Sequence, residues 1–266
     1  MNGAVKETPL VFACGDDELV GLVSEPAAAA AQCGVLVLVG GPQYRVGSHR
    51  QFALMAHRLA LAGHAAMRFD FRGMGDSSGP LRDFEQVYED VAAALAAFRR
   101  QCPGLRRIVL WGLCDAASAA LLYCRERRDP EVAGLCLLNP WVRSAETLAK
   151  TQVKHYYVQR LLQREFWLKL LRGRLNVASA VAELLAKLRL AQGGGTVVAG
   201  PAAPFQSRMA EGLRGFDGPV LLLISGDDYT AKEFLERAAS DPAWKGLLSK
   251  SGLSRRDFPE ADHTFS

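Results

Sequence analysis

The sequence lacks several features that would place it in a functional class at once. Its 266 residues carry 32 Lys and Arg against 28 Asp and Glu, a net charge of only +4, which is too small to indicate nucleic-acid binding. Its apolar runs are strand-sized, well short of the roughly 20 residues of a membrane-spanning helix. Neither H-E-x-x-H nor a Cys/His cluster is present, and these are the patterns that zinc requires. We therefore expect no metal, no nucleic acid and no transmembrane segment.

The cysteines also lack the spacing of a redox or metal site. None stands in a C-x-x-C pair, and several lie in apolar segments, where cysteine behaves as a small hydrophobic residue. No charged-then-apolar leader opens the chain. We expect a reduced, soluble, cytoplasmic protein in which the six cysteines are unpaired: Cys14, Cys33, Cys102, Cys114, Cys124 and Cys136.

What the sequence does contain is an alternation of short apolar runs with helical patterns. An antiparallel hairpin is predicted first, with strands at 9–14 and 18–25. Buried strands are predicted at 33–41, 64–71, 106–111, 132–140 and 218–226, and helices at 49–62, 84–101 and 115–127, the first capped by Ser48 and stopped by Gly63. This order predicts an α/β protein with a mostly parallel sheet and helices on both faces.

A long stretch without a strand pattern separates the last two of these strands. Residues 144–191 show helical periodicity instead, which ends at three consecutive glycines from Gly193. So long an excursion between neighbouring strands indicates an inserted helical cap rather than a loop. We predict a core formed by 1–140 and 216–266, with a cap at 141–215.

A candidate nucleophile stands where a predicted strand meets a predicted helix. The segment WGLCDAAS (111–118) matches the nucleophile-elbow form G-x-S-x-G, with Cys114 in place of Ser and Ala116 in place of the last Gly. Small flanking residues are needed because the nucleophile occupies a strained turn. Cysteine is also the side chain most ready to attack, and a helix N-terminus lowers its pKa. The alternative is that Cys114 is merely a packed cysteine.

The motifs around this segment resemble the α/β-hydrolase superfamily over nearly the whole chain. FDFRGMGDSSG (69–79) is similar to the signature D-x-R-G-x-G-x-S that follows strand four, and its glycines do not form the dinucleotide fingerprint, so no cofactor is expected. LLLISGDD (221–228) is similar to the strand that delivers the catalytic acid, and DFPEADHTF (257–265) to the histidine loop. More narrowly, GGPQYRVGSHRQF (40–52) and SGDDYTAKEF (225–234) resemble the hydrolase 1 type associated with bacterial exosortase and exopolysaccharide loci.

This resemblance implies roles for two further residues of a catalytic triad. His263 is the expected general base. The acid that orients it is Asp227 or Asp228, since both follow Gly226. We favour Asp228, which lies further into the loop and where the resemblance places the acid, and Asp227 would then be a turn or cap residue. The chain ends at Ser266, where the fold normally adds a helix, so either the chain is shortened or the histidine loop is weakly anchored.

The oxyanion hole needs two backbone N–H donors. One is expected from Asp115, directly after the nucleophile. The other normally comes from the residue after the strand-three glycine, which here is Pro42 and has no N–H. We expect Gln43 to donate instead, from its backbone or its side chain, or the loop to be reshaped.

Charged and aromatic residues suggest what kind of substrate approaches. Four such residues follow Gln43 on the same loop and at the start of the next helix: Tyr44, Arg45, His49 and Arg50. They either bind an anionic part of a substrate or are solvated loop and helix-cap residues. Residues 146–189 of the predicted cap hold nine Lys and Arg against three Asp and Glu. The cap is thus either an amphipathic lid over an acyl chain, with room for peripheral membrane contact, or a packed subdomain with a solvated basic face.

The function that these features favour is hydrolysis of an ester, thioester or lactone through an acyl-enzyme on Cys114. The partner is then a small acyl substrate. An acyltransferase with the same triad is one alternative. A second, from a different class, is a non-catalytic scaffold or binding protein of an exopolysaccharide or protein-sorting pathway, which Pro42 favours.

Overall fold

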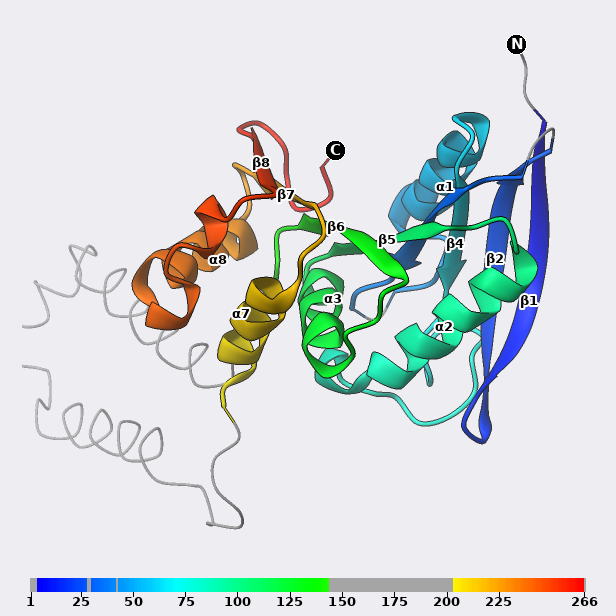
Figure 1. Ribbon diagram of the computed structural model, residues 1–266, viewed down its shortest axis with the longest axis horizontal. Coiled ribbons are helices and arrows are strands. Elements are labelled where there is room, and N and C mark those ends of the chain that lie inside the picture. Colours follow the sequence, from blue (N-terminus) through cyan, green and yellow to red (C-terminus); the bar gives the residue numbers. More distant parts are fainter. Residues whose placement is uncertain (1–3, 28–29, 42, 144–202, 266) are drawn as a thin grey trace, which may run out of the picture. The chain divides into compact units, whose positions relative to one another are not determined.

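The computed structural model describes residues 4–27, 30–41, 43–143 and 203–265. Eight strands form one sheet in the order β1-β2-β4-β3-β5-β6-β7-β8 (Figure 1). The strands are β1 (Val5–Cys14), β2 (Asp17–Pro26), β3 (Cys33–Leu38), β4 (Ala65–Phe69), β5 (Arg107–Leu113), β6 (Val132–Leu138), β7 (Val220–Ser225) and β8 (Leu253–Phe258). The hairpin β1–β2 and the pair β2–β4 are antiparallel, and all other pairs are parallel. The predicted α/β architecture is confirmed.

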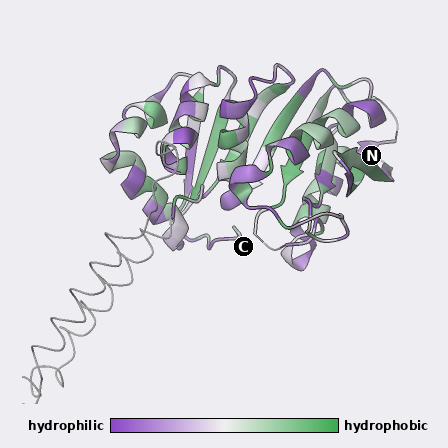
Figure 2. Cartoon of the chain, turned by 90° about the horizontal axis from the view of Figure 1, so that it is seen from below, coloured by the Kyte–Doolittle hydropathy of each residue, from purple (hydrophilic) through white to green (hydrophobic). Residues whose placement is uncertain are grey.

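Helices lie on both faces of this sheet. The α-helices are α1 (Gln51–Leu61), α2 (Tyr88–Gln101), α3 (Asp115–Glu126), α7 (Phe205–Gly215) and α8 (Tyr229–Ser240), and the short 3-10 helices are η1 (Ser48–Arg50), η2 (Phe84–Gln86), η3 (Pro242–Trp244) and η4 (Leu247–Ser249). The apolar strands run through the interior, while the helices alternate apolar and polar residues (Figure 2). Hydrophobic burial between the layers is therefore the main stabilising contribution.

Two separate apolar clusters mark the two faces. On one, Phe52 of α1 packs against Val37 and Val39, and its ring lies 5.5 Å from that of Trp111. The other, larger cluster is covered by α2, α3, α7 and α8. There α3 and α7 approach so closely that a Cβ on Gly212 would lie 2.0 Å from the carbonyl oxygen of Leu121. Only glycine permits this helix contact.

Two sequence predictions need correction or qualification. Ser48 does not cap the helix after it: α1 begins at Gln51, its N-cap is Arg50, and no side chain caps it. The reason is that His49 and Arg50 both have positive φ, 48° and 62°, which breaks the helix before Gln51. Helix α7, assigned above to the end of the cap, packs against α3. Residues 144–202, which hold the rest of the predicted cap, lie outside the described residues, so the core and cap division stays a prediction.

No helix within the described part of the chain is long and apolar enough to cross a membrane.

A buried ion pair fastens the loop after β4 to the start of α2. Arg72 and Asp90 are 4% and 0% exposed, and the Arg72 Nε donates to Asp90 Oδ1 over 2.6 Å. The backbone N–H of Arg72 donates to Asp90 Oδ2 over 2.9 Å, and the Cys14 thiol donates to Asp90 Oδ1 over 3.5 Å. Asp90 thus joins β1, the β4 loop and α2.

We predict that Asp90→Ala lowers the free energy of unfolding by about 3 kcal/mol, because the buried Arg72 loses its fully buried carboxylate partner and keeps only the half-exposed Glu89 at 2.9 Å and Asp17 at 3.9 Å. Urea unfolding followed by circular dichroism measures this. The matched control is Asp257→Ala, which removes a pair with Arg255 whose side chains are 36% and 52% exposed, and should cost less than about 1 kcal/mol. Equal losses of unfolding free energy in the two variants would contradict the stabilising role of the buried Arg72–Asp90 pair.

Candidate active site

The predicted nucleophile lies in a strained turn between β5 and α3. Cys114 has φ 63° and ψ −123° and is the N-cap of α3, a conformation that costs a non-glycine residue about 1–3 kcal/mol. Its N–H donates to Leu138 O over 2.9 Å, and its carbonyl accepts the Trp141 N–H over 3.1 Å. The Ser118 hydroxyl donates to Trp141 O over 2.7 Å. The loop after β6 therefore holds the turn from both sides.

Small residues make this turn sterically possible, as the sequence predicted. A Cβ on Gly112 would lie 2.6 Å from the backbone of Ala116, and a Cβ on Gly40 would lie 2.7 Å from the carbonyl oxygen of Leu113. A side chain on Gly112 would push α3 away from β5, and a side chain on Gly40 would push the loop after β3 away from the elbow. The geometry is that of a nucleophile elbow.

The predicted acid and base are in contact. His263 Nδ1 lies 2.8 Å from Asp228 Oδ2, and their side chains are 39% and 7% exposed. Asp228 also caps α8, accepting the N–H groups of Thr230 and Ala231 over 3.0 and 3.3 Å. Of the two candidate acids, Asp228 is thus the one that contacts the histidine, and the Asp227 N–H donates to Ala261 O over 3.1 Å.

Backbone contacts bring the β7 and β8 loops together at this point. Gly226 donates its N–H to Phe258 O over 2.8 Å, and a Cβ on Gly226 would lie 2.2 Å from Pro259 O. Asn139, for which the sequence predicted no role, is fully buried and has φ 43°. Its amide donates to the Ser225 hydroxyl over 2.7 Å and accepts the Ser225 N–H over 3.0 Å. The signal available was a lone polar residue directly after the apolar strand β6.

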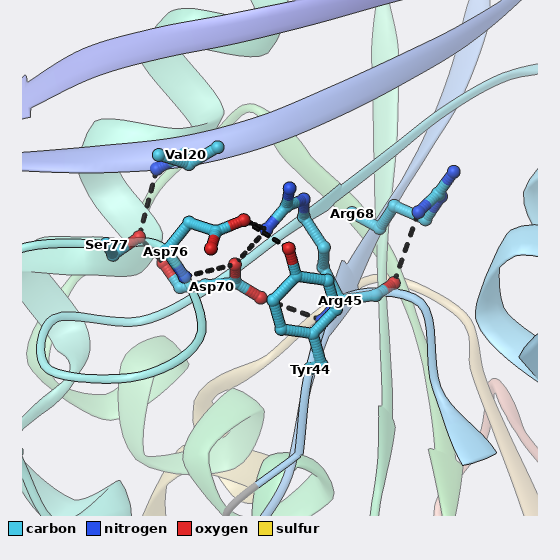
Figure 3. A network of polar contacts seen from close by, with 7 residues as sticks. All are labelled: Val20, Tyr44, Arg45, Arg68, Asp70, Asp76 and Ser77. Carbon is cyan, nitrogen blue, oxygen red and sulfur yellow. Dashed lines mark hydrogen bonds and ion pairs between the residues drawn. The ribbon is translucent and has the colours of Figure 1, made fainter.

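Tyr44 and Arg45, predicted at the substrate entrance, belong to a polar network between the β3 and β4 loops (Figure 3). The Arg45 guanidinium pairs with Asp70 and, over 2.8 Å, with Asp76, and the Tyr44 hydroxyl donates to Asp76. The hydrogen bonds from Tyr44 and Arg45 lower the pKa of Asp76. The charge of Arg45 is therefore compensated within the protein, so an anionic substrate would have to compete with two carboxylates.

Asp70 is the centre of this network. It is 1% exposed and accepts the backbone N–H groups of Arg45 and Asp76 over 2.7 and 3.1 Å. A Cβ on Gly75 would lie 2.2 Å from its carboxylate, which explains one of the loop glycines by packing. His49 and Arg50, the other two predicted entrance residues, are exposed.

The two predicted oxyanion donors, Gln43 and Asp115, both make contacts within the loop after β3. The Gln43 N–H donates to Gly41 O over 2.8 Å, and the Gln43 side-chain oxygen is buried without a partner in the described part of the chain. Asp115 is the first residue of α3, and its carboxylate accepts the Gly41 N–H over 2.8 Å. For Asp115 only the backbone role was predicted, and this side-chain contact was not.

Four of the remaining cysteines are poor nucleophiles. Burial raises the pKa of Cys14 to about 11, with the nearby Asp90 carboxylate adding to it, and raises the pKa of Cys102, Cys124 and Cys136 to about 12. Near neutral pH they stay protonated. None of the six cysteines forms a disulfide. Among the described residues, no group of three or more His, Cys, Asp or Glu side chains is arranged to hold a metal ion.

Solved structures of an esterase and of other proteins share this fold. An esterase of Pyrococcus furiosus matches with a TM-score of 0.61 and 16% identity, over 97% of this chain and 83% of that one. Est1E of Butyrivibrio proteoclasticus, solved with ferulic acid, matches with a TM-score of 0.61 and 12% identity, over 97% and 92%. A putative hydrolase of Agrobacterium vitis gives 0.56 and 18%, over 98% and 92%. At these identities the likeness shows the fold alone, which is the α/β-hydrolase fold.

A comparison with curated proteins found no match. The model of one protein family, described as serine aminopeptidase S33, matches residues 31–242. This range contains the elbow, the β4 loop and the β7 loop with Asp228. The chain therefore belongs to the serine aminopeptidase S33 family of α/β hydrolases, with a cysteine at the elbow position.

Proposed function

We propose that the protein hydrolyses an ester, thioester or lactone through an acyl-enzyme on Cys114. The observation that carries the proposal is the contact of 2.8 Å between His263 Nδ1 and Asp228. It occurs beyond β7 and β8, and the Cys114 elbow follows β5 at the same carboxyl end of the parallel strands. Ligands of open α/β sheets bind at this edge.

Each of the three residues has a distinct task in the proposed reaction. Asp228 holds the imidazole through Nδ1, so Nε2 is the nitrogen that takes the proton from the Cys114 thiol. The thiolate attacks the acyl carbonyl, the carbonyl electrons move to oxygen, and their return expels the alcohol or thiol, which takes the proton from His263. A water, deprotonated by His263, then releases the acid and restores the thiol.

The proposed substrate class is supported by the similar solved structures and by the chemistry of the nucleophile. The similar structure from Pyrococcus furiosus is that of an esterase, and a thiolate attacks activated acyl groups readily. The same triad with an acceptor alcohol in place of water would make the protein an acyltransferase. A role in an exopolysaccharide or protein-sorting system is implied by the resemblance of 40–52 and 225–234 alone.

We predict that Cys114→Ala lowers kcat/KM on a 4-nitrophenyl ester by about 10³-fold or more, because the attacking group is lost. Intact-protein mass spectrometry of the wild type during turnover should show one acyl adduct, which peptide mapping places on Cys114. Cys33→Ala is the control, since Cys33 is a half-buried thiol of β3, and should keep activity within about twofold. Full turnover by Cys114→Ala would disprove the mechanism. If the wild type itself shows neither adduct nor turnover, the protein is better explained as a binding protein.

We predict that Asp228→Asn lowers kcat by about 10²–10⁴-fold, because an amide no longer fixes the tautomer of His263. Asparagine still caps α8, so the melting temperature should change little, which separates catalysis from folding. Asp227→Asn is the matched control, because the contact of Asp227 with Ala261 is made by its backbone. If the two variants lose activity equally, Asp228 does not have the proposed role.

A further inference from the structure

The side chain of Asp115 lies where the loop after β3 meets the elbow. Its Oδ2 accepts the Gly41 N–H over 2.8 Å, across 74 positions of sequence. In α/β hydrolases, the oxyanion hole is formed by an N–H of this loop and by the N–H of the residue after the nucleophile. A carboxylate of the protein therefore contacts a group that belongs to the region where a substrate oxyanion should bind.

The loop offers few other donors at this place. Residue 42 is proline, which has no N–H. The Gln43 N–H is taken by the carbonyl oxygen of Gly41. Of the backbone N–H groups of residues 41–43, the Gly41 N–H is thus the one that contacts the elbow, where the Asp115 carboxylate accepts it.

The fit of the carboxylate is close. A Cβ on Gly40 would lie 2.2 Å from Asp115 Oδ1, so glycine is required there to admit the side chain. Oδ1 is buried and has no hydrogen-bond partner among the described residues. Burial raises the pKa of Asp115, whereas the N–H groups of Gly41, Ala116 and Asp115 itself act to lower it. The carboxylate thus interacts with N–H groups from both the loop and the elbow.

We propose that Asp115 is an internal occupant of the oxyanion hole, which a substrate carbonyl must displace before Cys114 can acylate. This inference rests on the proposed function, because it concerns the same reaction. A buried anion at this place also opposes the negative charge that develops on the carbonyl oxygen. Asp115 therefore holds the reaction rate below the value that the rest of the site would support.

The test compares Asp115→Ala and Asp115→Asn with the wild type on 4-nitrophenyl butyrate. Asp115→Ala frees the Gly41 N–H and should raise kcat/KM by about tenfold or more, since one oxyanion donor is worth about 10²–10³-fold. Asp115→Asn keeps an acceptor for Gly41 but removes the charge, and should give a smaller rise, about twofold or more. The control is Asp83→Asn, which removes a negative charge that acts on Asp115 without freeing Gly41, and should change kcat/KM by less than about twofold.

A second measurement does not depend on turnover. An aliphatic trifluoromethyl ketone adds to the Cys114 thiolate and forms a tetrahedral oxyanion without a leaving group. Its inhibition or dissociation constant should fall by about tenfold in Asp115→Ala, and binding should be lost in Cys114→Ala. Unchanged or weaker binding and activity in both Asp115 variants would overturn the inference.

The two proposals can fail separately. If Cys114→Ala abolishes ketone binding and turnover while the Asp115 variants show no gain, only the occupant role is wrong. If Cys114→Ala retains both, the proposed mechanism is wrong. A loss of activity in Asp115→Ala with a wild-type rate in Asp115→Asn would make Asp115 a tether that positions the loop, which also contradicts occupancy.

Discussion

The strained backbone of Cys114 is the constraint on which the candidate site depends. With φ 63° and ψ −123°, this residue is held by hydrogen bonds to Leu138 and Trp141, and it leaves no space for side chains on Gly40 and Gly112. The energy of that conformation has to come from packing elsewhere. The parallel strands on either side, β3 and β6, supply it because both are paired to β5 along their lengths.

The loops around the elbow are fixed by buried polar groups rather than by apolar contacts. Asp70 holds the β3 loop through Arg45, Asp90 holds the β4 loop through Arg72, and Asn139 holds the end of β7 through Ser225. Each of these acceptors is 1% exposed or less. Such bonds are directional, and breaking one leaves a buried group unsatisfied. They therefore set the positions of the loops more sharply than hydrophobic burial does.

The sequence was sufficient for features that arise from local patterns. Apolar runs predicted the buried strands, and small residues around Cys114 predicted the elbow, because both depend on neighbours in sequence. The start of α1 was missed because two non-glycine residues, His49 and Arg50, take positive φ, which no propensity indicates. Arg45 and its partner Asp70 are 25 positions apart in the sequence. The Asp115 carboxylate and its partner Gly41 are 74 positions apart. Such pairings follow from the folded topology and not from spacing.

The two departures of this site from the serine pattern act on different parts of the proposed reaction. A thiol reaches its nucleophilic form with less help than a hydroxyl, so Cys114 eases the attack on the carbonyl. It gives no help to the tetrahedral oxyanion, which depends on N–H donors. At the oxyanion hole, Pro42 has no N–H to donate, and the Gly41 N–H donates to the Asp115 carboxylate. In the proposed mechanism the limiting demand is therefore stabilisation of the oxyanion, and the substrates that suit the site best are acyl groups activated by a good leaving group.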